Sequence, residues 1–254
     1  MFEPGHDQAS GLRRMVAPET AAAGAPRALA LMAFALDEGA SPRWIAPLAH
    51  GLCALGARPV VIDAGPDAAL SQAFGVDPQL DLLDYLHGAA DFDAVAVRAG
   101  GVHVLRAERG LEAFALSGAP SRQLFGALAR LDHGFDVALL AMPAHELASM
   151  ADPGHAVPVL ALAPGHEGLV RAYATLKQLA EGFGYQRFAL VGQGGNGAQD
   201  ARRCHGRLAD TVRAFLNADV ALAGALPAGG EPDAGLARLA GALLDAAATP
   251  CSLH

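Results

Sequence analysis

Residues 27–42 read RALALMAFALDEGASP, and residues 43–63 read RWIAPLAHGLCALGARPVVID. The apolar run at 28–34 predicts a buried strand, residues 43–55 follow with helical spacing, and residues 59–62 form a second apolar run. A buried strand, a loop, a helix and a second buried strand make up the unit from which parallel sheets are built. The segment therefore predicts an α/β fold.

The same alternation continues through the rest of the chain. Further apolar runs predict strands at 137–141, 157–162, 188–191 and 220–226, and helical patterns lie at 121–131, 169–182, 198–217 and 236–247. A hairpin predicted at 94–97 and 102–105 interrupts the pattern. Strands that are apolar throughout, each followed by a helix, indicate a mostly parallel sheet with helices on both faces. We expect one α/β domain over 27–254, preceded over 1–26 by a short helix and a flexible linker.

Composition excludes several classes of protein. The chain of 254 residues is 52% hydrophobic and 17% charged, which favours a folded core over disorder. A net charge of −8, with Lys177 as the single lysine, opposes broad nucleic-acid binding. The 3 cysteines have no CxxC spacing, and residues 1–7 do not begin an export signal, so we expect a cytoplasmic location. No apolar segment reaches the roughly 18 residues that a membrane-spanning helix needs.

The loop between the first strand and the first helix lacks the groups that hold a phosphate. A phosphate loop needs glycines for close backbone approach, a lysine for the β- and γ-phosphates, and a hydroxyl for magnesium. Here Gly39 is the one glycine, and Asp37 and Glu38 stand where an anion would meet the backbone. One carboxylate about 4 Å from a phosphate charge costs about 4 kcal/mol at an effective dielectric near 20. We expect a loop that repels a triphosphate without a cation to offset the repulsion.

Two features together resemble the FlhG (FleN) branch of the MinD/ParA family of deviant P-loop ATPases. The first is DQASGLRR at 7–14, which is similar to the N-terminal DQAxxLR helix of that branch. The second is the order of elements across nearly the whole chain. That order includes VVID (60–63), LDHGFD (131–136), AYATLK (172–177) and DVALAGALP (219–227). The resemblance implies a P-loop NTPase-like fold of the MinD/ParA type.

The resemblance also shows which nucleotide-binding residues are lost. Aligned on the helix and Asp63, the GKGGVGKT loop of the family falls on residues 35–42. Its two lysines become Leu36 and Ser41, and its magnesium-binding threonine becomes Pro42. The second switch I aspartate becomes Gly65, the Walker B aspartate becomes Ala141, and the adenine-contacting asparagine falls near Gly192.

We therefore expect a pseudo-ATPase. Its vestigial nucleotide site would consist of Asp37, Glu38, Gly39, Ser41, Asp63 and Ala141. Neither ATP nor magnesium is expected to bind, and no metal site or catalytic residue is expected. A lone Asp63 has no base or magnesium ligand beside it, so we expect it to stabilise the turn after its strand.

The resemblance implies a partner, the signal-recognition-type GTPase FlhF, whose hydrolysis the N-terminal helix of the family stimulates. On that interpretation Gln8 reaches toward the nucleotide site of the partner, Asp7 caps the helix, Leu12 anchors it and Arg13 engages acidic or phosphate groups, with Ala9 on the same face as Leu12. A flagellar transcription regulator is a further candidate partner. The loss of the ATP-driven dimer implies a monomer, with weak or indirect membrane contact and recruitment to the cell pole through the partner.

Two alternatives stay open. An active MinD/ParA-type ATPase with an atypical loop, regulating flagellar biosynthesis, fits the same order of elements. A small-molecule enzyme could instead use the loop histidines. His145, His155 and His166 follow strands, where α/β sites gather, but they lack HxH or HExxH spacing.

Three other motifs favour structural roles. Residues 192–197 match GxGxxG, but Asp210 and Asp219 are not placed to take a ribose hydroxyl. The neighbours Cys204 and His205 face different directions on a helix. The apolar stripe of the last helix, with Arg238 as its one cation, favours packing on the sheet over membrane binding.

Overall fold

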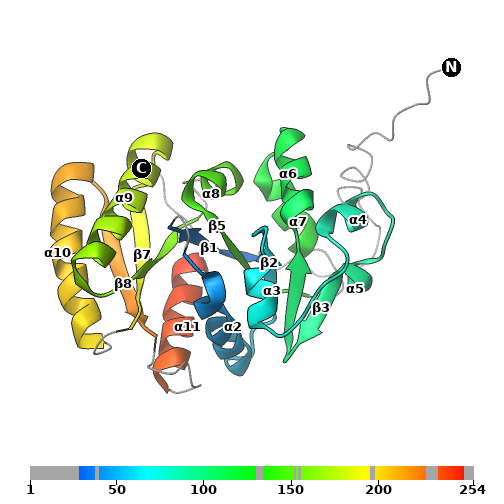
Figure 1. The fold of residues 1–254 in the computed structure, drawn as a ribbon, viewed down its shortest axis with the longest axis horizontal. Coiled ribbons are helices and arrows are strands. Elements are labelled where there is room, and N and C mark those ends of the chain that lie inside the picture. Colours follow the sequence, from blue (N-terminus) through cyan, green and yellow to red (C-terminus); the bar gives the residue numbers. More distant parts are fainter. Residues whose placement is uncertain are drawn as a thin grey trace.

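The computed structural model describes residues 29–37, 40–129, 134–151, 153, 156–194, 198–226 and 234–248. Within these ranges, eight strands form one sheet in the order β3-β4-β2-β5-β1-β6-β7-β8, in which only β3 runs antiparallel to its neighbour (Figure 1). The strands are β1 (Ala30–Leu36), β2 (Pro59–Asp63), β3 (Ala96–Ala99), β4 (Val102–Arg106), β5 (Val137–Pro143), β6 (Val159–Leu162), β7 (Arg187–Gly192) and β8 (Asp219–Ala225).

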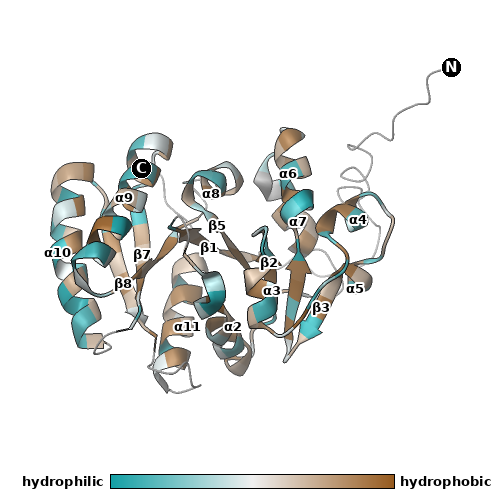
Figure 2. Ribbon diagram, in the orientation of Figure 1, coloured by the Kyte–Doolittle hydropathy of each residue, from teal (hydrophilic) through white to brown (hydrophobic). Residues whose placement is uncertain are grey.

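Helices cover both faces of the sheet, as predicted. One face carries α2 (Ile45–Ala54), α3 (Ala69–Ala73) and α11 (Ala234–Ala248). The other carries α4 (Leu82–Leu86), α5 (Phe92–Val95), α6 (Glu108–Leu116), α7 (Ser121–Ala129), α8 (Ala144–Met150), α9 (Gly165–Phe183) and α10 (Ala198–Leu216). Figure 2 shows apolar residues along the strands between these layers and hydrophilic residues on outer helices such as α10.

The strands are buried on both sides because successive side chains enter opposite layers. In β2, Val60 and Ile62 join the core on the side of α6 and α9, whereas Val61 joins the core on the side of α2 and α11. All five residues of β2 are buried. An apolar strand without polar alternation is therefore what this position in the sheet requires.

The last helix packs on the sheet, which confirms the structural interpretation of its apolar stripe. Leu236, Leu239 and Leu243 are each 1% exposed, and α11 contacts α2, β8 and β1. Full burial of one such leucine contributes about 1.5–3 kcal/mol. This apolar face is thus used within the domain. None of the helices in the described ranges combines the length and apolar character needed to cross a bilayer.

The sequence predictions differ from the structure in the bounds of the hairpin and in the short helices. Residues 92–95 form the short helix α5, and the first hairpin strand is 96–99 instead of 94–97. The short helices α3, α4, α6 and α8 were not predicted. Helices as short as α3, α4 and α8 display little of a repeating apolar face, so periodicity does not reveal them. The predicted N-terminal helix lies outside the described residues.

Candidate functional site

A cleft lies at the carboxyl ends of β1 and β6. These strands are neighbours, but β1 leads through α2 to one half of the sheet and β6 leads through α9 to the other. In open α/β sheets, ligands bind at such a topological switch point. The cleft has a volume of about 360 Å³, and its walls come from Ala35, Leu36, Asp37, Ala40, Ser41, Trp44, Ala161, Ala163, Arg171 and Gln193.

The loop between β1 and α2 forms one wall of this cleft. Asp37 and Ser41 line it, whereas Glu38 and Gly39 lie outside the described residues. The hydroxyl of Ser41 accepts a hydrogen bond from the Arg43 amide at 3.4 Å and caps a single 3-10 turn, η1 (Pro42–Trp44). Pro42 has no amide hydrogen to offer an anion. The amide groups at the start of this turn are therefore not available to an anion, because Pro42 has no amide hydrogen and the Arg43 amide is bonded to Ser41.

Asp37 is held in place by α9 on the opposite face of the sheet. Its Oδ1 accepts a hydrogen bond from the Thr175 hydroxyl at 2.7 Å, and Thr175 is 7% exposed. The same hydroxyl lies 3.3 Å from the carbonyl oxygen of Arg171, one helical turn earlier. A hydrogen bond to an ionised partner is stronger than a neutral one, so it holds the carboxylate at the cleft.

Arg171 corrects one sequence expectation. Arg171 lines the same cleft, so a cationic side chain does stand near the loop, although it comes from α9. Sequence reasoning missed Arg171 and Thr175 because no pattern links residue 171 to residue 37. The available signal was their four-residue spacing on a helix that follows a buried strand, because α/β sites gather beyond such strands.

The other two described residues predicted for a vestigial nucleotide site lie at the ends of β2 and β5. Asp63 and Ala141 are paired in register on these neighbouring strands, and they are 2% and 4% exposed. The position expected for a Walker B carboxylate is therefore an apolar residue beside a single aspartate. Two carboxylates are not available at this pair of positions to bind magnesium.

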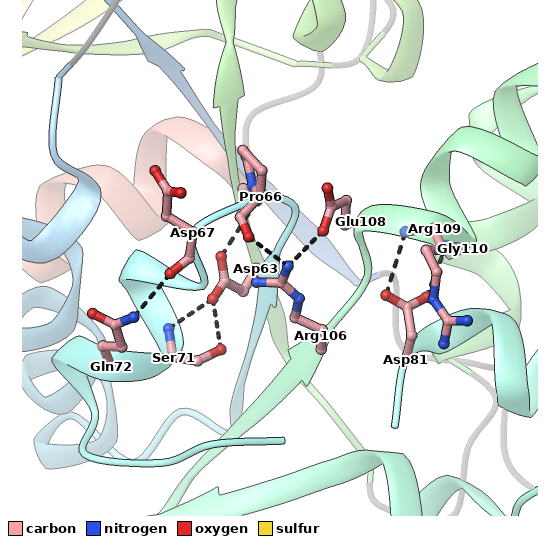
Figure 3. Close-up of polar contacts among 11 residues, drawn as sticks. Asp63, Pro66, Asp67, Ser71, Gln72, Asp81, Arg106, Glu108, Arg109 and Gly110 are labelled. Carbon is pink, nitrogen blue, oxygen red and sulfur yellow. Dashed lines mark hydrogen bonds and ion pairs between the residues drawn. The ribbon is translucent and has the colours of Figure 1, made fainter. Parts of the chain in front are cut away.

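The hydrogen bonds of Asp63 are used within the fold. Its Oδ2 accepts from the amide and the hydroxyl of Ser71 at 2.7 and 2.6 Å, and its Oδ1 accepts from the Gly65 amide at 3.4 Å (Figure 3). These bonds tie the end of β2 to the first turn of α3. The predicted structural role of Asp63 in the turn after its strand is consistent with this arrangement.

The segment after Asp63 is attached from a second side by Arg106, at the end of β4. Its Nη2 donates to the carbonyl oxygen of Pro66 at 3.0 Å and to Glu108 at 2.5 Å. The Gln72 amide of α3 also donates to the carbonyl oxygen of Asp67 at 2.9 Å. Figure 3 shows these contacts converging on residues 64–68. The segment is thus held by both a strand and a helix.

Two of the other sequence candidates have structural roles. Gly192 lets α10 approach β7, because a Cβ on this residue would lie 2.4 Å from the Cβ of Ala201; residues 195–197 of the same motif lie outside the described residues. His205 contacts the Val220 carbonyl oxygen at 2.9 Å, away from Cys204. Burial also raises the pKa of the Cys53 thiol, which lowers its thiolate fraction and its reactivity at neutral pH.

The two loop histidines that the structure describes do not assemble into a metal site. His145 is 63% exposed and lies 3.7 Å from Glu146 at the start of α8, His166 lies in the first turn of α9, and His155 lies outside the described residues. Within the part of the chain that the structure describes, no group of three histidine, cysteine or carboxylate residues is placed to hold a metal ion.

Comparison with known proteins identifies the class of fold. No protein-family model and no curated protein sequence matches the chain. Among solved structures, it is similar to the cell division ATPase MinD of Pyrococcus furiosus, with a TM-score of 0.57 and 18% identity over 85% of this chain and 98% of that one. It is also similar to the MinC:MinD cell division protein complex of Aquifex aeolicus, with a TM-score of 0.56 and 16% identity over 86% and 93% of the two chains.

A plasmid partition protein from Borrelia burgdorferi is a third similar structure, with a TM-score of 0.53 and 12% identity over 85% of this chain and 96% of that one. The chain therefore has the α/β fold of MinD-type P-loop ATPases, as its sequence predicts. At these identities the likeness establishes the fold alone.

Proposed function

We propose that this chain is a non-hydrolysing, FlhG-like regulator of flagellar number and placement that acts by binding its partner. The observation that carries the pseudo-ATPase part is the pairing of Asp63 with Ala141. The Asp63 carboxylate is hydrogen-bonded to Ser71. The position at which the family has its second carboxylate is occupied by the buried methyl group of Ala141. A site that lacks a magnesium carboxylate and both lysines has lost the groups that P-loop ATPases use to bind magnesium and to stabilise the charge that develops during phosphoryl transfer.

The attachment of residues 64–68 supports a constitutive mode of action. In nucleotide switches, this kind of loop is ordered by the γ-phosphate and its magnesium ion and is released on hydrolysis. Here Arg106 and Gln72 supply contacts to Pro66 and Asp67 instead, and Ser71 holds Asp63 at the start of the loop. A loop held by protein groups needs no nucleotide to keep its conformation.

The proposed partner is the GTPase FlhF, bound through the DQASGLRR segment at 7–14. The resemblance of this segment to the activating helix of the FlhG branch supports the assignment. The segment precedes the domain and does not require the ATP site, so its function is independent of the lost lysines. Gln8 is proposed to act at the nucleotide of the partner, where a glutamine can orient the attacking water.

The partner assignment is tested by the GTP turnover of FlhF with the full chain added. We expect turnover to rise, and Gln8→Ala to remove roughly nine-tenths or more of the increase, because orienting the water is a large part of activation in trans. Ser10→Ala, in the same segment, is the matched control and should keep the increase. Turnover that does not respond to the chain, or that responds equally to the Gln8→Ala variant, excludes the proposed role.

One observation favours the alternative of an ATPase with an atypical loop. Arg171 places a guanidinium in the cleft, and arginine is well suited to binding phosphate oxygens. Nucleotide titration separates the two functions, and the pseudo-ATPase predicts a large loss of affinity for ATP.

A further inference from the structure

The cleft between β1 and β6 carries one positive and one negative side chain that do not neutralise each other. Arg171 and Asp37 both line it, yet neither makes an ion pair with a residue that the structure describes. Oδ1 of Asp37 accepts from Thr175, and Oδ2 has no such bond among the described residues. Opposite charges kept apart in one cleft can each bind an opposite charge on a ligand.

The rest of the cleft wall is small and largely apolar. Ala35, Ala40, Ala161 and Ala163 leave space, while Leu36 and Trp44 add larger apolar surface. The ring of Trp44 packs edge-to-face with Phe34, with ring centroids 5.3 Å apart. A volume of about 360 Å³ lies at the lower end of the range for small-molecule sites. The wall therefore fits a compact ligand with an apolar part.

The helix α9 brings the two charged side chains to the same cleft. Arg171 and Thr175 are four residues apart on this helix, so their Cβ atoms lie about 5–6 Å from each other. Because Thr175 holds Asp37, the side chain of Arg171 begins one helical turn from the point at which the carboxylate is held. An α-amino acid carries its ammonium and carboxylate groups on one carbon atom, so a ligand of this kind suits two opposite charges that line one small cleft.

We propose that this cleft binds a free neutral α-amino acid. Arg171 receives the carboxylate of the ligand, Oδ2 of Asp37 receives its ammonium group, and Leu36 and Trp44 contact its side chain. A ligand without net charge matches a cleft that offers one cation and one anion, whereas a triphosphate does not. The proposal goes beyond the function above and does not depend on the flagellar partner.

The test is isothermal titration of the full chain with glycine, L-alanine, L-leucine and L-phenylalanine, each alone. We expect saturable binding of at least one of them. Arg171→Met and Asp37→Asn should each weaken that binding about tenfold or more, because each removes one charge-assisted contact. The amide introduced by Asp37→Asn keeps an acceptor for Thr175, so the loop stays attached. Arg187→Met, at the opposite end of β7, is the control and should bind normally.

Two analogues of leucine test recognition of both charges. 4-Methylpentanoate lacks the ammonium group and 3-methylbutylamine lacks the carboxylate, so each should bind about tenfold or more weakly than L-leucine if leucine is a ligand. The melting temperature of each variant, measured alone, distinguishes lost binding from lost folding. If none of the four amino acids binds, or if the Arg171→Met and Asp37→Asn chains bind as the control does, the proposal is wrong.

Discussion

Magnesium ATP is expected to bind this chain roughly a thousandfold more weakly than it binds a lysine-bearing phosphate loop. One carboxylate about 4 Å from a phosphate charge costs about 4 kcal/mol, and each ~1.4 kcal/mol lowers affinity tenfold. Asp37 is held at the cleft by Thr175, which prevents it from turning away freely. The measurement is a calorimetric titration with ATP, with and without magnesium. Saturable, magnesium-dependent binding in the micromolar range would contradict the pseudo-ATPase proposal.

A matched pair of variants identifies the source of any residual binding. Arg171→Met removes the cation that lines the cleft, so it should abolish weak binding of phosphate oxygens there. Arg187→Met leaves the cleft unchanged and should have no effect. If residual ATP binding survives Arg171→Met, the nucleotide binds elsewhere on the chain.

Replacing Asp81 with alanine is expected to lower the free energy of unfolding by about 3–4 kcal/mol, because each buried donor left without a partner costs about 1–3 kcal/mol. Asp81 is 3% exposed, and its carboxylate accepts from the amides of Leu83 and Gly110 at 2.9 and 2.8 Å and from that of Arg109 at 3.3 Å. It therefore caps α4 and also binds the first turn of α6, and Figure 3 shows the contacts with Arg109 and Gly110. Urea denaturation of the variant measures the loss.

Two further variants make the result specific. Asp67 is exposed and its side chain makes no hydrogen bond or ion pair within the described ranges, so Asp67→Ala should change stability by less than about 0.5 kcal/mol. A Cβ on Gly110 would lie 2.6 Å from the Cβ of Leu82 and 2.8 Å from the Leu83 amide nitrogen, so Gly110→Ala should destabilise the same junction. An Asp81→Ala chain as stable as Asp67→Ala would show that water replaces the carboxylate at no cost.

Most of the sheet could be predicted because its strands are apolar without interruption. The predicted runs at 59–62, 188–191 and 220–226 differ from β2, β7 and β8 by one residue at an end or at both ends. The helices between β2 and the hairpin were missed, because α3 and α4 have five residues each. Their positions depend on single polar residues, Asp63 and Asp81, each of which also has a partner eight or more residues away.

Of the residues that line the cleft, the sequence predicted those of the loop between β1 and α2 and none of those on α9. Asp37 and Ser41 line the cleft, and Asp63 makes the turn contacts expected of it. The opposite wall depends on which face α9 turns toward β1, and local sequence does not contain that information. The start of α9 was also predicted at 169 instead of 165, which left Arg171 near a helix end and without a defined direction.

The loop after β2 is attached at three points, because Ser71 holds Asp63 while Gln72 and Arg106 hold Asp67 and Pro66. This attachment has a consequence for how such a regulator could be controlled in a cell. A surface whose conformation is the same at high and at low ATP concentration cannot signal the energy state of the cell. On the proposed function, its effect would scale with the number of copies present. The rates at which the chain is synthesised and degraded would then control its effect, as ATP hydrolysis does in a cycling ATPase.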